Sequence, residues 1–359
     1  MNSMKRILMI MNGNNIGGAE LQFIELANYL GAKHQLTLVC LQGEASVRGG
    51  RLSNDVDLKV FPYAGGRSAV LPLLKAIRYC RTIKPDAIFT TSFAGDFAGA
   101  LSRTQPFTKL LSLQTVSADK PHKQVDAFIL GQFDFLIAGC TDIEEFLIRN
   151  RHSREKIVVI NNWVDFSART ISLNSTATRA KYGLGTDELL IGCIGRMHEQ
   201  KAQEFLIRAF KRAAQKIPRL KLALVGDGPT IDQMKSEADA HPDIVFTGTV
   251  TGEDYNNLLG AFDIYVQPSR YEGLPRTLLD AMYMRLPVIV SSANGLKDVI
   301  CNGENGLIVP AEDAEGLSKA IIRLASDLDL AGRIAKNARQ SAMENHSMIA
   351  QLHKIEVMI

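Results

Sequence analysis

The chain has 359 residues, of which 46% are hydrophobic and 22% charged, and its formal net charge is +3 at pH 7. This composition excludes a disordered or fibrous protein, and the length exceeds what one hydrophobic core usually organises, so we expect two domains. The net charge is too small to predict a nucleic-acid partner. The five cysteines are far apart and form no C-x-x-C pair, which predicts neither a disulfide framework nor a zinc site and favours a reducing cytoplasm.

The first half of the chain alternates short apolar runs with helix-length segments. This strand-then-helix order predicts a parallel sheet covered by helices on both faces. The apolar run at 7–11 is too short for a signal peptide and lacks a cleavage site, so we interpret it as the first buried strand. No stretch approaches the roughly 20 apolar residues that span a bilayer. The predicted strands lie near 6–11, 35–41, 57–61, 86–90, 109–113, 134–138 and 156–160, with helices near 18–30, 70–83, 93–103 and 141–150.

A polar segment at 166–187, rich in Ser, Thr and Ala, interrupts this pattern and predicts the connection into a second domain. The alternation then resumes, and from about residue 313 the chain has helical patterns only. We therefore predict an α/β protein of two Rossmann-like domains that face each other across a cleft, 1–165 for the acceptor and 166–344 for the nucleotide sugar, with a last helix at about 345–359 packing back on the first. The second set of strands lies near 189–194, 220–225, 243–246, 263–266 and 287–290, with helices near 200–216, 229–240, 253–261 and 276–285.

Glycines and cations follow several predicted strands, at the sheet edge where ligands of such folds bind. Gly17 and Gly18 stand at a helix start, where main-chain N–H groups and the helix dipole can receive an anion. Arg196 and Lys201 lie on a turn into a helix and can converge on a diphosphate. Gly226 follows the next strand, where a backbone can approach a flat ring or a phosphate. Each loop by itself is also compatible with an ordinary turn. The loop with Gly17 and Gly18 lacks the G-x-G-x-x-G spacing, which disfavours a dinucleotide-binding dehydrogenase.

Two acids provide the most informative spacing. Glu272 lies in a Gly/Pro loop before a predicted helix and Asp280 lies within that helix, with seven residues between them. A loop acid and a second acid two turns further on can contact different ends of one long ligand. Glycosidases also use paired carboxylates, as acid and nucleophile. They need no clamp for a nucleotide, however, and the accompanying cations and glycines favour a nucleotide ligand.

The segment 267–282, which contains both acids, resembles the signature PS-x-x-EG-x-P-x-x-x-LEAM of the family 4 (group 1) retaining glycosyltransferases, which have the GT-B fold. The resemblance covers nearly the whole chain, because further segments match that family in the same order. They are GGAE at 17–20, VVINNWVD at 158–165, GRM-x-x-x-K at 195–201, FTGTV at 246–250, NGLKD at 294–298 and GENGL at 303–307.

The resemblance implies a role for each matching residue. Arg196 and Lys201 would bind the diphosphate of the donor and, with Glu272, carry the catalysis. Glu272 would contact hydroxyls of the transferred sugar, and Asp280 would bind the ribose hydroxyls. The remaining donor-binding residues that the resemblance implies supply main-chain contacts or lie beside the nucleobase: Gly17, Gly18, Gly226, Val250, Gly273 and Leu274.

Two of the candidate site residues depart from the family pattern, in addition to Asn161 for Pro and Trp163 for Gly in the VVINNWVD segment. Asp280 stands where the family has Glu; because Asp is one methylene shorter, either the helix sits closer or water mediates the ribose contact. Gln114 stands on the acceptor side where many members have His. An amide cannot carry a proton as an imidazole can, so the usual role of that position is not expected here.

We expect a metal-independent hexosyltransferase that retains the anomeric configuration. The bond to the anomeric carbon breaks first, the acceptor hydroxyl attacks from the face that the diphosphate leaves, and the leaving oxygen accepts its proton. Electrostatic stabilisation and domain closure then supply the catalysis without a cofactor or a dedicated base. The nucleotide-diphosphate sugar serves as co-substrate, with a UDP-sugar slightly favoured over a GDP-sugar.

Two other functions are compatible with the same residues. A nucleotide-sugar epimerase shares the two-domain fold but needs groups that remove a proton beside the anomeric carbon. It would convert the donor alone, which a transferase only hydrolyses slowly. A non-catalytic sugar-nucleotide-binding subunit would bind the donor and turn over nothing with any acceptor.

The setting of the reaction follows from the family resemblance and from one helix. The family is commonest in bacterial surface polysaccharide, lipopolysaccharide or glycolipid synthesis, which implies a saccharide or lipid-linked acceptor. The segment 71–81 mixes leucines with basic residues. It can rest on an anionic membrane, or cover the sheet with a solvated basic edge. We therefore expect a cytoplasmic protein, with peripheral contact at the inner face of the plasma membrane as a further hypothesis.

Overall fold

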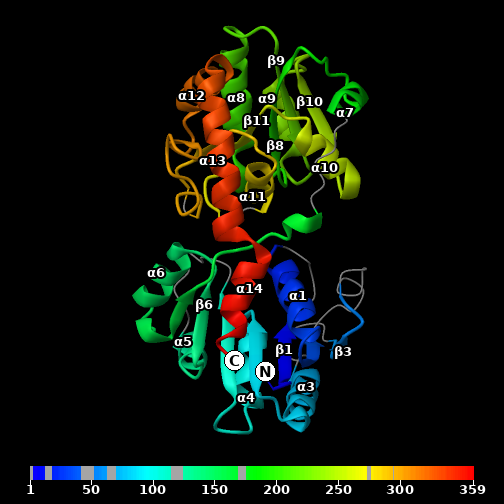
Figure 1. Ribbon diagram of the computed structural model, residues 1–359, viewed down its shortest axis with the longest axis vertical. Coiled ribbons are helices and arrows are strands. Elements are labelled where there is room, and N and C mark those ends of the chain that lie inside the picture. The colour runs from blue at the N-terminus through cyan, green and yellow to red at the C-terminus, as the bar shows by residue number, and fades with distance from the viewer. Residues whose placement is uncertain are drawn as a thin grey trace. The chain divides into compact units, whose positions relative to one another are not determined.

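The computed structural model describes residues 3–12, 18–41, 52–62, 70–114, 124–168, 175–272, 276–293 and 295–359. The chain forms two compact units, one made of Met1–Asn162 with Ile349–Ile359 and the other of Trp163–Met348. Each contains a parallel sheet flanked by helices (Figure 1). This confirms the predicted α/β class with two Rossmann-like sheets.

The described sheet of the first unit has the strand order β3-β2-β1-β4-β5-β6-β7, and its strands pair in parallel. The order reverses between β1 and β4, and ligands of doubly wound sheets bind at the carboxyl ends of strands at such a point. Both strands are apolar and almost wholly buried, as strands covered on both faces must be. The strands are β1 (Arg6–Met11), β2 (Gln35–Cys40), β3 (Val56–Val60), β4 (Ala87–Thr91), β5 (Lys109–Gln114), β6 (Phe135–Ala138) and β7 (Ile157–Val159).

The helices of the first unit cover this sheet. Residues of α3, α4, α5 and α6 share one hydrophobic core with Leu8 and Ile10 of β1, while α1 contacts β1, β2 and β3. The last helix contributes Glu356, which accepts a hydrogen bond from the Tyr29 hydroxyl at 2.8 Å and pairs with Lys33. These helices are α1 (Gly18–Gly31), α3 (Val70–Ile83), α4 (Phe93–Ser102), α5 (Gln124–Leu130), α6 (Thr141–Arg149) and α14 (Met348–Glu356).

The described sheet of the second unit has the order β10-β9-β8-β11-β12-β13, and it reverses between β8 and β11. One core lies on each face, the first under α8 and α12 and the second under α10, α11 and α13. The strands are β8 (Leu189–Ile194), β9 (Leu220–Val225), β10 (Ile244–Gly248), β11 (Ile264–Gln267), β12 (Val288–Ser291) and β13 (Leu307–Val309). The helices are η3 (Phe166–Ala168), α7 (Ser175–Lys181), η4 (Glu199–Lys201), α8 (Gln203–Ala214), α9 (Ile231–Ala238), α10 (Gly252–Gly260), α11 (Arg276–Tyr283), α12 (Ala314–Ser326) and α13 (Leu328–His346).

Close packing and helix caps explain several of these elements. A Cβ at Gly192 on β8 would lie 2.1 Å from the Phe262 ring, so only glycine lets that ring cover the strand. The carboxylates of Asp313 and Asp327 accept main-chain hydrogen bonds at the starts of α12 and α13, as N-caps do. No helix in the described ranges combines the length and hydrophobicity that crossing a lipid bilayer requires.

Candidate active site

The loops that follow β8 and β11 leave the sheet of the second unit as neighbours, because these strands flank the point where the strand order reverses. The loop after β8 contains Arg196 and passes through the short helix η4, which ends at Lys201. The loop after β11 contains Glu272. The topology therefore brings together two segments that are far apart in the sequence.

Lys201 and Glu272 form an ion pair at this point. Lys201 Nζ lies 2.5 Å from Glu272 Oε1, and the two side chains are 18% and 6% exposed. The Ser269 hydroxyl donates to the same oxygen at 2.6 Å, and Gln267 Nε2 lies 3.2 Å from it. Within the described residues, all hydrogen bonds to this carboxylate go to Oε1. None of the described residues forms a hydrogen bond with Oε2.

A chain of buried hydrogen bonds from β11 fixes the Glu272 loop. Gln267 Nε2 donates to the Ser269 hydroxyl at 2.8 Å, and its Oε1 accepts from the Tyr265 hydroxyl at 2.7 Å. That hydroxyl also lies 2.9 Å from Thr277 Oγ1 on α11. Burial raises the pKa of Tyr265 well above its ordinary value of 10, so the phenol stays neutral and the network keeps its donor.

Arg270 ties the two loops together on their outer side. Its guanidinium donates to Glu204 Oε1 at 2.6 Å and also contacts Glu312 and the Glu199 carbonyl. The main chains are linked as well, because Arg270 N donates to the Gln200 carbonyl at 2.8 Å and Gln200 Nε2 donates to the Tyr271 carbonyl at 2.9 Å. These contacts hold the acid and the lysine in place from both sides.

Arg196 lies where three strand ends meet. Gly195 N donates to the Val225 carbonyl and Gly226 N to the Gly248 carbonyl, both at 2.9 Å. A Cβ at Gly226 would lie 2.1 Å from the Gly195 carbonyl oxygen, and the φ angle of Gly226 is +133°. Only glycine allows this approach. The Arg196 side chain is exposed above these loops.

Asp280 is buried on α11, and the Tyr255 hydroxyl donates to its Oδ2 at 2.7 Å. Tyr255 belongs to α10, which begins two residues after Val250. Val250 is half-buried and packs against the same core as α10 and α11. The charges of Glu272 and Asp280 both raise the pKa of Tyr265, although less than its burial does. The two acids therefore act on one phenol.

The other predicted site residues are distributed as follows. Gly18 is the first residue of α1, and Gln114 is the last residue of β5, both in the first unit. Gly17, Gly273 and Leu274 lie outside the described residues, and their roles stay predictions. Within the described ranges, no group of three or more His, Cys, Asp or Glu side chains is placed to share a metal ion.

Sequence reasoning missed the residues that support the site. Gln267 and Ser269 belong to the segment that carries the family resemblance, but they received no role. Tyr265 and Tyr255 are recognisable only from the fold, because one is a strand residue among apolar neighbours and the other lies on a separate helix. The one signal in the sequence is that Ser269 lies three residues before Glu272, close enough for its hydroxyl to reach that carboxylate.

Two family models match the chain in succession. Residues 16–168 match the model described as Glycosyltransferase Family 4, and residues 188–327 match the model described as Glycosyl transferases group 1. The first range lies mainly in the first unit, the second range lies in the second unit, and together they take in most of the chain. The chain belongs to the group 1, family 4 glycosyltransferases.

Known relatives of this glycosyltransferase agree with the assignment. The lipopolysaccharide core biosynthesis glycosyltransferase LpsE of Rhizobium meliloti is 26% identical over 92% of each chain. An Escherichia coli UDP-Gal:alpha-D-GlcNAc-diphosphoundecaprenol alpha-1,3-galactosyltransferase is 28% identical over 56% of this chain and about half of its own length, 53%. HepE of Anabaena, solved in complex with UDP and glucose, covers 99% of each chain with a TM-score of 0.84 at 19% identity, which shows that the fold is GT-B.

Proposed function

We propose that this glycosyltransferase moves a hexose from a nucleotide-diphosphate donor to a saccharide or lipid-linked acceptor and retains the anomeric configuration. The observation that carries the proposal is the meeting of Lys201 and Glu272 at the strand reversal of the second unit. A cation beside a carboxylate with one available oxygen supplies both a contact for a diphosphate and an acceptor for sugar hydroxyls.

The diphosphate contacts follow from charge and exposure. Arg196 is exposed at the end of β8, and Lys201 is partly exposed on the same loop. In the structure Glu272 neutralises Lys201, so the lysine is held in position before any nucleotide binds. Two cations on one loop stabilise the negative charge that develops on the leaving nucleotide. We propose that they do so without a metal ion.

The two acids are proposed to contact the two ends of the donor. Glu272 Oε2 accepts hydrogen bonds from hydroxyls of the transferred sugar, while Oε1 stays occupied by Lys201 and Ser269. Asp280 accepts hydrogen bonds from the ribose, and its contact with Tyr255 sets the orientation of the carboxylate. Because the Tyr265 network fixes both segments, the sugar and the ribose are held at a defined separation.

A UDP-sugar is the proposed donor, ahead of a GDP-sugar. Support comes from HepE, which shares the fold and was solved with UDP and glucose, and from the E. coli relative, whose name specifies UDP-Gal and a diphosphoundecaprenol-linked acceptor. The relative LpsE is named for lipopolysaccharide core biosynthesis. We propose a corresponding role in bacterial surface polysaccharide or glycolipid synthesis.

Peripheral membrane contact is proposed for α3 of the first unit. Leu71 and Leu74 are 62% and 47% exposed on this helix, and Lys75, Arg78 and Arg81 are exposed beside them. Exposed leucines flanked by basic residues suit an anionic lipid surface. Such contact would bring the enzyme to lipid-linked acceptors at the inner face of the plasma membrane.

A ligand panel tests the donor proposal. Thermal shifts are measured with UDP, GDP, ADP and their sugars, because a ligand that binds only the folded form raises its stability. We expect UDP to give the largest shift among the free nucleotides, and EDTA to leave it unchanged. Proton NMR of the donor then follows the anomeric configuration from substrate to product. The proposal fails if no nucleotide shifts the melting temperature, if the product is inverted, or if the donor alone is epimerised.

A further inference from the structure

The first unit contains a small polar pocket at the carboxyl ends of β4 and β5. Its volume is about 90 Å³, and it is lined by Ser92, Phe93, Asp96, Gln114, Asp126, Ile129 and Leu130. Because a water molecule occupies about 30 Å³ in the liquid, the pocket has room for the edge of a sugar ring but not for a whole disaccharide. It lies next to the reversal between β1 and β4, where a sheet of this topology binds ligands.

A buried carboxylate forms the polar wall of this pocket. Asp96, in the first turn of α4, is only 5% exposed. Its Oδ1 accepts hydrogen bonds from the Thr90 and Ser112 hydroxyls, each at 2.6 Å. Its Oδ2 has one long contact, 3.5 Å from Gln114 Nε2. Within the described residues this oxygen has no shorter partner, so the pocket holds a desolvated carboxylate oxygen with acceptor capacity to spare.

The fold holds Asp96 in this position by close packing. A Cβ at Gly95 would lie 3.0 Å from the Ile10 carbonyl of β1, and a Cβ at Gly99 would lie 2.4 Å from Thr90 Cγ2 of β4. The two glycines let α4 sit directly on the sheet. Ser92, at the turn from β4 into α4, has a φ angle of +71°. This conformation is costly for a residue other than glycine, and such strain concentrates at functional sites.

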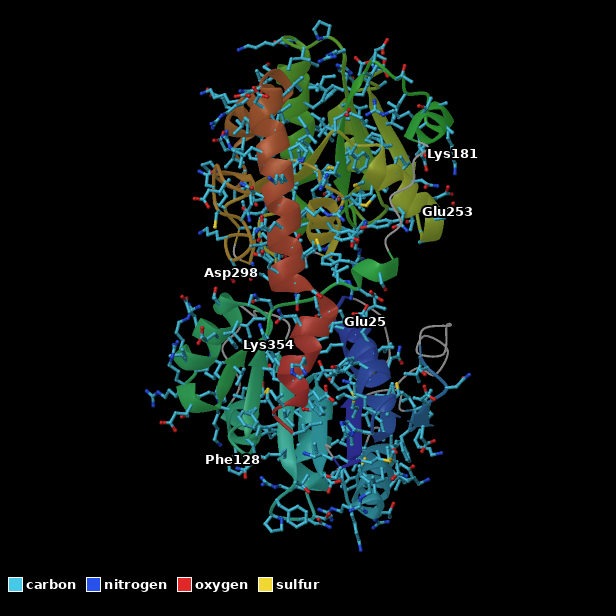
Figure 2. All side chains as sticks on the ribbon, viewed as in Figure 1. Glu25, Phe128, Lys181, Glu253, Asp298 and Lys354 are labelled. Atoms are coloured by element: carbon cyan, nitrogen blue, oxygen red, sulfur yellow. The ribbon has the colours of Figure 1, made fainter. Side chains whose placement is uncertain are left out.

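The other walls of the pocket complement a sugar. Gln114 Nε2 donates to the Ser112 hydroxyl at 2.7 Å, so the amide is oriented at the pocket. Phe93 is 52% exposed and offers an aromatic surface, and Ile129 and Leu130 close the apolar side. Phe128, their neighbour on α5, is 72% exposed and is labelled in Figure 2. A few polar groups among apolar and aromatic walls is the usual composition of a small-molecule site.

The charge of the pocket restricts its ligand. Of the described lining residues, Asp126 on α5 is the other charged group. The basic residues of the packed elements lie elsewhere: Arg6 and Lys109 begin β1 and β5 at their amino ends, and Arg81 of α3 donates to the Leu101 carbonyl near the end of α4. Lys75 and Arg78 are exposed on α3. Two carboxylates facing one small space repel an anion and favour a hydroxyl donor.

We propose that this pocket binds the acceptor through a neutral, hydroxyl-bearing edge of its sugar, with Asp96 Oδ2 accepting a hydrogen bond from an acceptor hydroxyl and Gln114 assisting. The inference rests on the proposed function and assigns Asp96 a role in acceptor selection. Burial raises the pKa of Asp96 to about 6, although the hydrogen bonds from Ser112, Thr90 and Gln114 lower it. The group is therefore mostly ionised at pH 7, and both of its oxygens can accept hydrogen bonds. A phosphate or uronic acid is excluded from this subsite.

Saturation-transfer NMR with methyl glycosides tests the assignment. The probes are the methyl α-glycosides of glucose, galactose and mannose, with methyl α-glucuronide as the anionic comparison. We expect the wild-type enzyme to bind at least one neutral glycoside and not the glucuronide. Asp96→Asn and Phe93→Ala should weaken that binding about tenfold, the effect of losing one good contact. Phe107→Ala, which removes an exposed phenylalanine outside the pocket, should not.

The thermal shift with UDP, measured on the same samples, separates the two proposals. A retained UDP shift in each variant shows that the second unit is intact, and Phe93→Ala decides the matter if Asp96→Asn does not fold. The inference is overturned if the wild type binds none of the neutral glycosides, if the glucuronide binds as well as they do, or if both variants bind like the wild type. Loss of the UDP shift in the wild type would instead count against the donor proposal, whatever the glycosides do.

Discussion

Lys201 and Glu272 are separated by 71 residues in the sequence, yet Lys201 Nζ lies 2.5 Å from Glu272 Oε1. The contact exists because β8 and β11 are neighbours at the strand reversal, so the loops that follow them share one edge of the sheet. The ion pair links the proposed phosphate contact, Lys201, to the proposed sugar contact, Glu272. A substitution of either residue should therefore affect the binding of both the phosphate and the sugar.

Replacing Lys201 by Met should reduce both stability and activity. Glu272 would be left largely buried without its cation, at a cost of about 3 kcal/mol. Transfer should also fall about 100-fold, because one source of electrostatic stabilisation is lost. Urea denaturation and initial rates measure the two effects. If loss of the ion pair causes the loss of stability, the double variant with Lys201→Met and Glu272→Gln is more stable than the sum of the two single effects predicts. Strictly additive effects would contradict this explanation.

Arg196→Ala should weaken nucleotide binding without affecting the fold. The side chain is exposed, so the free energy of unfolding should change by less than about 0.5 kcal/mol. The dissociation constant of UDP should rise about 10-fold to 100-fold, as expected for a charge-assisted contact. Isothermal titration calorimetry measures it. Arg219→Ala is the matched control, because Arg219 is also exposed but precedes β9 at the opposite edge of the sheet; equal losses in the two variants would refute the assignment.

Asp280→Asn should discriminate between ligands. If the carboxylate binds the ribose, its loss weakens UDP about tenfold but leaves the affinity for inorganic pyrophosphate unchanged. Competition against a fluorescent UDP analogue measures both. An equal loss for UDP and pyrophosphate would show that Asp280 acts only by supporting α11 through Tyr255.

Gly226→Ala should destabilise the second unit by about 2 kcal/mol or more, because the new methyl group meets the Gly195 carbonyl and the backbone conformation disfavours a side chain. Gly332→Ala provides the contrast. Gly332 lies within α13, and no atom lies within 4 Å of a new Cβ there. Alanine at this position should therefore raise the free energy of unfolding by about 0.5 to 1 kcal/mol. Denaturation midpoints of the two variants should move in opposite directions.

Asp96 should make the stability of the enzyme depend on pH. Its folded pKa of about 6 exceeds the ordinary 3.8, so folding favours the protonated form. The resulting stability is fully present below about pH 4 and is lost as the pH rises through 6. The stability of Asp96→Asn relative to the wild type should therefore increase by up to about 3 kcal/mol between pH 4 and pH 8. Asp187→Asn, at an exposed position of the second unit, is the control; parallel curves for wild type and Asp96→Asn would contradict this.

The sequence allowed the sheets to be predicted because alternating apolar runs and helical patterns have a direct structural cause. Three of the described strands and α-helices escaped prediction. The strand β13 has only three residues, and α7 is a short polar helix inside a segment that we expected to be a linker. The helix α5 has only seven residues, QVDAFIL, which show no clear helical period of apolar positions. The predicted helix at 200–216 is also divided, since Ala202 adopts a left-handed conformation between η4 and α8.

The candidate site could be predicted only where its residues belong to one loop or to a recognisable segment. Arg196, Lys201 and Glu272 met that condition, and the structure brings the last two into contact. Asp96 did not, because a lone acid in the helical segment FAGDFAGALS resembles a solvated position until the fold places it over Thr90 and Ser112. Side chains that become functional through burial carry no local signature, since burial is a property of the tertiary structure.

The first unit is discontinuous along the chain, because Ile349–Ile359 belongs to it and Glu356 bonds to Tyr29. During translation, Trp163–Met348 leaves the ribosome in full before those closing residues do. Domains fold as units while the nascent chain grows, so the second unit can reach its native state first. The unit that begins the polypeptide is then the last to be completed, and a chain that ends at Met348 would contain the whole second unit and a first unit that lacks α14.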